Sequence, residues 1–202
     1  MSEKRSDSEV IGASLADPKA FGEIFERHFA AIHGYLRRRF DDGLADELTA
    51  QTFFVAFDNR SRFDRERPDS RPWLFGIATN LARSHRRREV VELRAIAALA
   101  PEDGPPIEGV EARLDAEQMR GALARGLAEL PAEEADVLCL LVWADLNQTE
   151  VAGALGIPLG TVKSRLSRAR RRLRRALELP PTPTDDSPTP TPASPGGVRW
   201  TT

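Results

Sequence analysis

The N-terminal part of the chain carries hydrophobic residues at intervals of three and four, which places their side chains on one face of an α-helix. Such series occupy residues 21–36, 44–55 and 73–81, and Asp17 and Pro18 suit the N-cap and first turn of the first series. We therefore predict three helices here. Aromatic side chains at these positions are expected in the core: Phe21, Phe25, Phe53, Phe57 and Trp73.

The C-terminal part continues the helical pattern. Leucines at intervals of three and four predict a helix that ends at Pro131, and the apolar run 137–143 fits a buried helix that includes Trp143 in the core. Flanking Ala and Glu residues favour helix over strand in this run. No stretch has a convincing strand pattern, so the predicted fold class is all-α.

Residues 148–166 have the pattern of a helix-turn-helix. Ala152 is small where two helices must approach closely, and Gly156, four residues later, suits the positive φ of a tight turn. The second helix is expected to place one hydrophobic series inward: Val162, Leu166, Ala169, Leu173 and Leu177.

Two segments rich in proline divide the chain. Residues 101–109 interrupt two helical stretches, and residues 180–202 hold 7 of the 15 prolines, which prevents helix formation and core burial. We predict two small helical domains joined by a flexible linker, the second a helix-turn-helix domain, followed by a disordered Pro/Thr-rich tail. The expected segments are 1–17 (N-terminal), 18–92 (first domain), 93–110 (linker), 111–179 (helix-turn-helix domain) and 180–202 (tail).

Residue content argues against several classes of protein. Cys139 is the one cysteine, so there is no disulfide framework and no cysteine-rich zinc site. His28 and His33 are five residues apart and do not share one metal-facing stripe, so we expect surface or partly buried residues and no metal. With no Gly-rich phosphate loop and no catalytic triad pattern, we expect neither a cofactor nor an enzyme. No apolar run has membrane-spanning length and no signal peptide is evident, so we expect a cytoplasmic protein without membrane insertion.

Charge is unevenly distributed although the net charge is only −2. Of 29 basic residues 26 are Arg, a bias that a GC-rich genome explains as well as nucleic-acid binding does. Position favours binding: residues 111–150 hold nine acids and three bases, whereas residues 151–177 hold eight bases and no acid. A solvated helix face would mix both signs, so we predict that this basic helix docks in a DNA major groove.

The two halves together resemble a bacterial RNA polymerase sigma factor of the extracytoplasmic-function (ECF) type. Leu130-Pro131 and residues 152–170 (AGALGIPLGTVKSRLSRAR) are similar to region 4 of that family, which reads the −35 promoter element. Residues 45–49 (ADELT) with Thr52-Phe53, and residues 71–82 (RPWLFGIATNLA), are similar to region 2. The resemblance covers about residues 18–90 and 111–177.

This resemblance implies DNA-contacting residues in both halves. On the recognition helix the candidates for −35 contacts are Thr161, Lys163, Ser164, Arg165, Arg168, Arg171, Arg172 and Arg175. Region 2 of the family captures a flipped −10 base in a loop, and a rim of hydrogen-bonding and positive groups suits an extruded base. The candidates for −10 contacts are Asn59, Arg60, Ser61, Arg62 and Phe63 in the loop and Asn80, Arg83, Arg86 and Arg87 on the next helix.

The resemblance also implies protein partners. Residues 41–58 hold five acids and no base, which suits docking on a basic protein surface, although a merely solvated face remains an alternative. In the family this helix binds the β′ clamp helices of core RNA polymerase, which predicts polymerase contacts by Asp42, Asp46, Glu47 and Gln51. Region 4 is expected on the polymerase β flap, and an anti-sigma factor is a further expected partner.

One alternative function remains open at this point. A conventional helix-turn-helix regulator, with an N-terminal domain that dimerises or binds a ligand, would bind duplex operator alone, usually as a dimer. A sigma factor, expected to be a monomer when free, would give promoter-specific transcription only together with core polymerase. The two functions are therefore distinguishable by experiment.

Overall fold

The structure, a computed structural model, describes residues 5–97, 126–127 and 129–177. Its described residues form helices and connecting turns and contain no strand, which confirms the predicted all-α class. The proline-rich segment 101–109 and the tail 180–202 lie outside the described residues. Among the described residues, no helix has the length and apolarity needed to cross a membrane.

The first group of helices is built around local capping signals. Asp17 caps the first turn as predicted, with Pro18 at its start, and Asp41 accepts a hydrogen bond from the backbone N–H of Leu44. Ser6 and Glu9 form a capping box on a further helix that hydrophobic spacing did not reveal. The elements are α1 (Asp7–Ser14), η1 (Pro18–Phe21), α2 (Gly22–Arg37), α3 (Asp42–Asp58), η2 (Arg60–Arg62) and α4 (Arg71–Ala97).

The second group contains the predicted helix-turn-helix. Its elements are α6 (Ala132–Val142), α7 (Gln148–Leu155) and α8 (Leu159–Ala176). Asn147 and Glu150 form a capping box at the start of α7, and Gly156 ends this helix with a φ of 63°, as the turn requires. Val162, Leu166 and Ala169 are buried, so the predicted inward face of α8 is confirmed at these positions.

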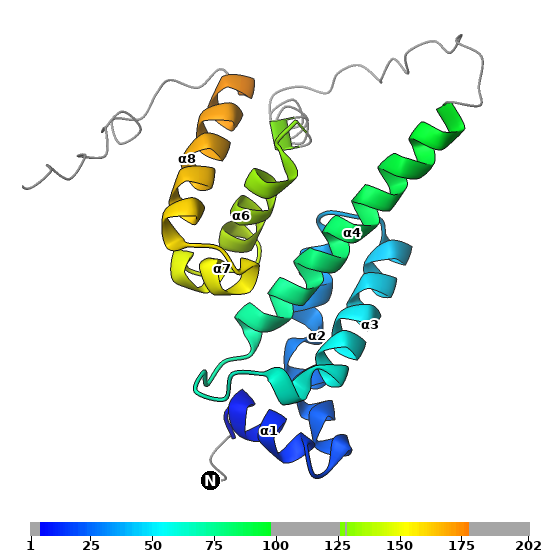
Figure 1. The fold of residues 1–202 in the computed structure, drawn as a ribbon, viewed down its shortest axis with the longest axis vertical. Coiled ribbons are helices and arrows are strands. Elements are labelled where there is room, and N and C mark those ends of the chain that lie inside the picture. Colours follow the sequence, from blue (N-terminus) through cyan, green and yellow to red (C-terminus); the bar gives the residue numbers. More distant parts are fainter. Residues whose placement is uncertain (1–4, 98–125, 128, 178–202) are drawn as a thin grey trace, which may run out of the picture.

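The two groups of helices share one hydrophobic core. α7 and α6 both pack against α4, and Figure 1 shows α7 beside the N-terminal half of this long helix. Buried residues of α4 such as Leu74 and Phe75 belong to the same cluster as Val137, Leu140 and Val151 of the second group. Helix α4 itself continues to Ala97, past the boundary expected at residue 92. In this structure the helix groups are therefore packed together.

Burial corrects several expectations for single residues. Phe21 and Phe53 are in the core, but Phe25 is 42% exposed, so its predicted core position is wrong. Phe25 makes an edge-to-face contact with Phe53 and a tilted contact with Phe29, and part of its ring still faces solvent. His28 is buried, beyond the surface or partly buried position expected for it.

The three other aromatic residues expected in the core are less deeply buried than predicted. Phe57, Trp73 and Trp143 are partly buried and pack against the core. Helical spacing gives the direction of a side chain, whereas the depth of burial depends on which neighbouring helix covers it.

Candidate nucleic-acid interface

Helix α8 carries its basic residues on the side opposite to its buried face. Thr161 and Arg165 are half-buried. Val162, Leu166 and Ala169 fix the rotation of the helix, because they are anchored in the core. The remaining predicted −35 residues are exposed: Lys163, Ser164, Arg168, Arg171, Arg172 and Arg175.

Acidic side chains of α6 neutralise part of this basic face. Arg165 pairs with Glu133 at 2.6 Å, and Arg168 and Arg172 each approach the carboxylate of Glu134 at 3.1 Å. The Arg168 and Arg172 side chains are about half exposed, at 46% and 54%. Glu134 itself is buried, with a side chain 7% exposed, so these two arginines also supply the countercharge of a buried carboxylate.

The loop between α3 and α4 holds the predicted −10 residues in different environments. Ser61 and Arg62 are exposed, whereas Phe63 is 6% exposed and packs on Trp73 with ring centroids 5.1 Å apart. Asn59 caps α3 by donating to the carbonyl oxygen of Val55 at 2.9 Å. Phe63 is therefore a core residue of the loop and not one of its projecting side chains.

Arg60 is held against the protein. Its guanidinium lies 4.0 Å from the centroid of the Phe57 ring and donates to the carbonyl oxygens of Phe57 and Ser14. Of the five predicted loop residues, Ser61 and Arg62 thus present the side chains that a ligand can reach most freely.

A cavity of ≈ 220 Å³ lies beside this loop. Arg62 and Arg67 supply cationic groups to its lining, and Asp64 and Asp69 supply acidic ones. Phe63 and Trp73 add aromatic rings, and Gly153 and Ala154 of α7 also line it. Trp73 was assigned only to the core by its spacing. The structure adds it to the candidate site because its half-buried ring lines this cavity.

The predicted DNA contacts on α4 fall into two sets. Asn80 and Arg87 are exposed. Arg86 lies over the Phe40 ring at 5.4 Å from its centroid, and Arg83 donates to Asp136 of α6 at 2.5 Å. In this arrangement Arg83 serves the contact between the helix groups.

Asp136 is the centre of that contact, a role that no sequence pattern indicated. Its side chain is 0% exposed and pairs with Arg83 and with Arg39, whose side chain is 2% exposed. Arg39 also donates to the hydroxyl of Tyr35, and burial raises the pKa of this tyrosine to about 12. A buried acid in a helix can be recognised from sequence only if its distant partners are known.

Helix α3 presents the predicted polymerase-facing residues toward solvent. Asp42, Asp46 and Glu47 are exposed and Gln51 is half-buried. Three local contacts hold them: Arg37 with Asp42, His33 with Asp46, and Gln51 with Glu47. On the same helix Phe54 is 72% exposed, which adds an apolar group near the acidic ones.

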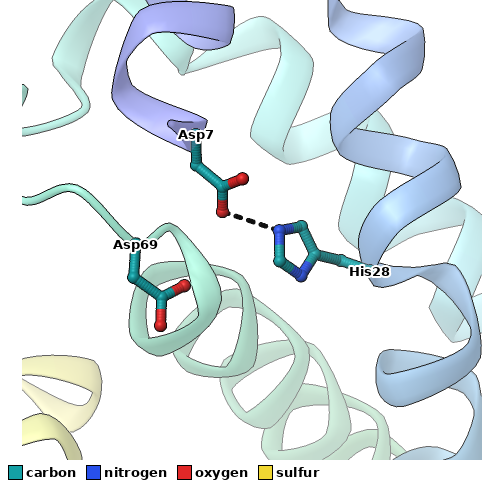
Figure 2. Close-up of side chains that lie close together, drawn as sticks. All are labelled: Asp7, His28 and Asp69. Carbon is teal, nitrogen blue, oxygen red and sulfur yellow. Dashed lines mark hydrogen bonds and ion pairs between the residues drawn. The ribbon is translucent and has the colours of Figure 1, made fainter. Parts of the chain in front are cut away.

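Asp7, His28 and Asp69 come together from α1, α2 and the segment before α4 (Figure 2). Their possible ligand atoms all lie within 4.8 Å of one another, a grouping that the sequence did not indicate. Asp7 already accepts hydrogen bonds from Arg27, His28 and both donor groups of Ser70. These donors, which include the Arg27 guanidinium, satisfy the Asp7 carboxylate. We therefore interpret the cluster as a hydrogen-bonded junction between the three segments.

Hydrogen bonding also controls the ionisation of Asp7. Burial alone would raise the pKa of this carboxyl. The hydrogen bonds from His28, Ser70 and Arg27 outweigh burial and hold the pKa far below its usual range. Asp7 is therefore a charged buried group at neutral pH.

Comparison with known proteins identifies both halves of the chain. Residues 24–90 match the family model described as Sigma-70 region 2, and residues 126–175 match the one described as Sigma-70, region 4. The chain is 30% identical over 171 residues to the ECF RNA polymerase sigma factor SigL of Mycobacterium tuberculosis, covering 84% of this chain and 95% of SigL. It is also 30% identical over 163 residues to the ECF sigma factor RpoE of Cereibacter sphaeroides, covering 78% and 86%.

Solved structures support the same fold. The structure of CnrH in complex with the cytosolic domain of CnrY matches with a TM-score of 0.61 and 24% identity, covering 85% of this chain and 97% of CnrH. The sigma factor RpoE of Bartonella quintana, solved with the anti-sigma factor NepR, matches with a TM-score of 0.59 and 24% identity, covering 79% and 98%. Three findings agree. The C-terminal half contains a basic helix-turn-helix, the N-terminal half matches region 2, and the relatives are similar over most of their length. The chain belongs to the ECF RNA polymerase sigma factors, which bind RNA polymerase and direct promoter-specific transcription initiation.

Proposed function

We propose that three separate surfaces carry out this function: α8 reads −35 duplex, the α3–α4 loop with α4 captures the −10 strand, and α3 docks on core polymerase. The observation that carries the proposal is the segregation of charge. Residues 151–177 hold eight bases and no acid, and residues 41–58 hold five acids and no base. Phosphates attract the first surface, and a basic protein surface attracts the second.

For −35 DNA we propose a division of labour along α8. Ser164, Arg165 and Arg168 lie toward the start of the helix and are assigned to base edges, as in other helix-turn-helix proteins. The later arginines are assigned to phosphates, which position the helix without reading sequence. The exposure of Arg171 and Arg175 supports this assignment, because phosphates can reach these guanidinium groups.

For the −10 strand we propose that an unstacked base binds the side of this cavity that Arg62, Phe63 and Trp73 form. Stacking of a base on an aromatic ring contributes about 1–3 kcal/mol, and Trp73 offers such a ring. Extruding a base costs a few kcal/mol, so hydrogen bonds from Arg62 and Ser61 are needed in addition. Asn80 and Arg87 on α4 are assigned to the neighbouring nucleotides.

For the protein partners we propose core polymerase at α3 and an anti-sigma factor. The exposed acids Asp42, Asp46 and Glu47 suit the first. The second is supported by the similar sigma factors CnrH and RpoE, which were solved with CnrY and the anti-sigma factor NepR. We further propose that the chain is a monomer when free, acts in the cytoplasm, catalyses no reaction of its own and uses no cofactor or metal.

Transcription with purified components tests the proposal. Core polymerase and the full chain are incubated with fragments of genomic DNA, and transcript starts are mapped to identify a promoter. We expect specific starts only when both are present. Tight dimeric binding of duplex by the chain alone, without specific starts in the presence of core polymerase, would contradict the proposal and favour a conventional regulator.

Two variants then separate the DNA surfaces. Arg62→Ala is expected to weaken binding of a −10 single strand to the holoenzyme about tenfold, since hydrogen bonds to charged groups contribute about 1.5–3 kcal/mol. Arg171→Ala is expected to weaken −35 duplex binding and reduce its salt dependence. Lys19→Ala, which removes an exposed cation of η1, is the matched control and should change neither.

A further inference from the structure

Helix α1 contacts the loop that follows α3 at three points along the loop. Arg60, near the start, donates to the carbonyl oxygen of Ser14 at 3.3 Å. Ser8 donates its hydroxyl to the carbonyl oxygen of Arg65, in the middle, at 2.6 Å. At the end, the backbone N–H and hydroxyl of Ser70 donate to Asp7 at 3.1 and 2.7 Å. One short helix thus holds residues 60–70 from end to end.

The helix is itself firmly attached to the rest of the fold. Val10 and Ile11 are 0% exposed in the hydrophobic core. Asp7 is bound to Arg27 and His28 of α2 at 2.8 and 2.7 Å, and Figure 2 shows the second contact. The loop is therefore tied, through α1, to a rigid element and not only to its own ends.

Close packing adds a fourth contact. The Arg65 guanidinium lies directly over Gly12, where a Cβ would collide with it. Glycine at this position lets the loop side chain rest against the surface of α1. The contacts with α1 involve Arg60 and Arg65, whereas Ser61 and Arg62 stay exposed and Arg62 lines the cavity.

We infer that α1 is a positioning element for −10 strand capture: it holds the α3–α4 loop in the form that presents Ser61 and Arg62 to an unstacked base. The inference rests on the proposed function of that loop. A loop held in place before DNA arrives does not have to be ordered on binding, which leaves more of the contact energy for base capture. Ser8, Asp7 and Ser70 act through the loop and do not themselves touch DNA.

The decisive variant is Ser8→Ala, which removes one hydrogen bond to the loop and leaves the core residues of α1 intact. The probe is a fluorescent single strand carrying the non-template −10 element of a promoter transcribed by the holoenzyme. We expect the Ser8→Ala holoenzyme to bind this strand about three- to tenfold more weakly, the equivalent of one lost hydrogen bond. Core affinity and −35 duplex binding should equal those of the wild type, and Ser8→Thr should restore strand binding.

Ser6→Ala is the matched control for general weakening of α1. It removes the N-cap hydroxyl and so weakens the start of the helix, but Ser6 makes its capping bonds to Glu9 and not to the loop. We expect near wild-type strand binding by this variant. Equal loss in Ser6→Ala and Ser8→Ala, or no loss in Ser8→Ala, would overturn the positioning role.

A second pair of measurements keeps this inference separate from the proposed function. Ser70→Ala loosens the end of the loop from Asp7 and should reproduce the weakened strand binding of Ser8→Ala. If Arg62→Ala leaves strand binding unchanged, the assignment of the loop to the −10 strand fails. If Arg62→Ala weakens binding but Ser8→Ala and Ser70→Ala do not, only the role of α1 fails.

Discussion

At the scale of single residues, Asp7 shows how much depends on one buried carboxylate. It joins α1 to α2 through Arg27 and His28 and to the start of α4 through Ser70. Burial would favour the neutral acid, yet the surrounding donors keep its pKa well below the ordinary value. Three elements distant in sequence therefore depend on one charge.

We predict that Asp7→Asn lowers the free energy of unfolding by about 3 kcal/mol at neutral pH, because the buried Arg27 then keeps only Glu23 as a carboxylate partner and Ser70 loses a charged acceptor. A depressed carboxyl pKa stabilises the fold above the unfolded-state pKa of about 3.9, and this stabilisation declines as pH falls below that value. Urea unfolding across pH 3 to 7 should show the wild type and the variant converging in acid. Glu26→Gln, at an exposed position of α2, should follow the wild-type curve. A constant difference at all pH values would contradict this account.

At the scale of elements, α3 combines an acidic surface with one exposed aromatic side chain. Glu47, Gln51 and Phe54 are spaced by four and three residues, so they lie along one face of the helix. Phe54 is 72% exposed and contributes little to the folded core. Protein interfaces commonly place a large apolar anchor among groups that set charge complementarity, which is the arrangement here.

Phe54→Ala is therefore expected to weaken core-polymerase affinity about tenfold or more without lowering stability by more than about 0.5 kcal/mol. Fluorescence titration of labelled protein with core polymerase measures the first quantity, and urea unfolding measures the second. Val142→Ala removes a similarly exposed apolar group from α6, at 64% exposure, and serves as the control. Unchanged core affinity in Phe54→Ala would remove this residue from the proposed docking surface.

At the scale of the whole molecule, the two helix groups are packed so that α7 covers part of the proposed −10 site. Gly153 and Ala154 line the cavity, and Asp136 holds Arg83, a predicted DNA contact. The −35 and −10 elements are about 25 base pairs apart, or about 85 Å at 3.4 Å per pair. We therefore expect the groups to separate on promoter DNA, which rehydrates Asp136, Arg39 and Arg83 together.

Gly76 offers a direct test of this separation. A Cβ at Gly76 would overlap the carbonyl oxygen of Ala154, so Gly76→Ala should push α7 away from α4. Within α4 itself the change favours helix by about 1 kcal/mol, which leaves the first group folded. Spin labels on cysteines introduced at the exposed positions Ser84 and Thr149 should report a longer, broader distance distribution.

Two controls apply to this distance measurement: the native Cys139 must not take up label, and a second Gly→Ala change must leave the distance unaltered. Burial raises the pKa of Cys139 to about 11, so labels react at the introduced cysteines instead. Gly34 has open space where its Cβ would be, so Gly34→Ala gives α2 the same helix-favouring change without a clash. An unchanged distance in Gly76→Ala would show that the contact between α4 and α7 does not control the spacing of the two groups.

Much of the architecture followed from local patterns. Apolar periodicity predicted α2, α3, α4, α6 and α8, and Gly156 has the positive φ expected for the turn. The sequence did not reveal α1 in this way. It spans only eight residues, too few for a repeated apolar spacing to stand out, and it is held by contacts with distant segments, such as that between Ser8 and Arg65.

The sequence by itself determined the helical class, the helix-turn-helix, the segregation of charge and the resemblance to sigma factors, because each is written in the spacing and type of neighbouring residues. Tertiary structure alone decided the burial of Phe63, the exposure of Phe25 and the pairing of Asp136 with Arg39 and Arg83. These properties depend on which distant surfaces meet. A periodic pattern predicts that one face of a helix is apolar or charged, but packing decides what covers that face and which charges must be paired there.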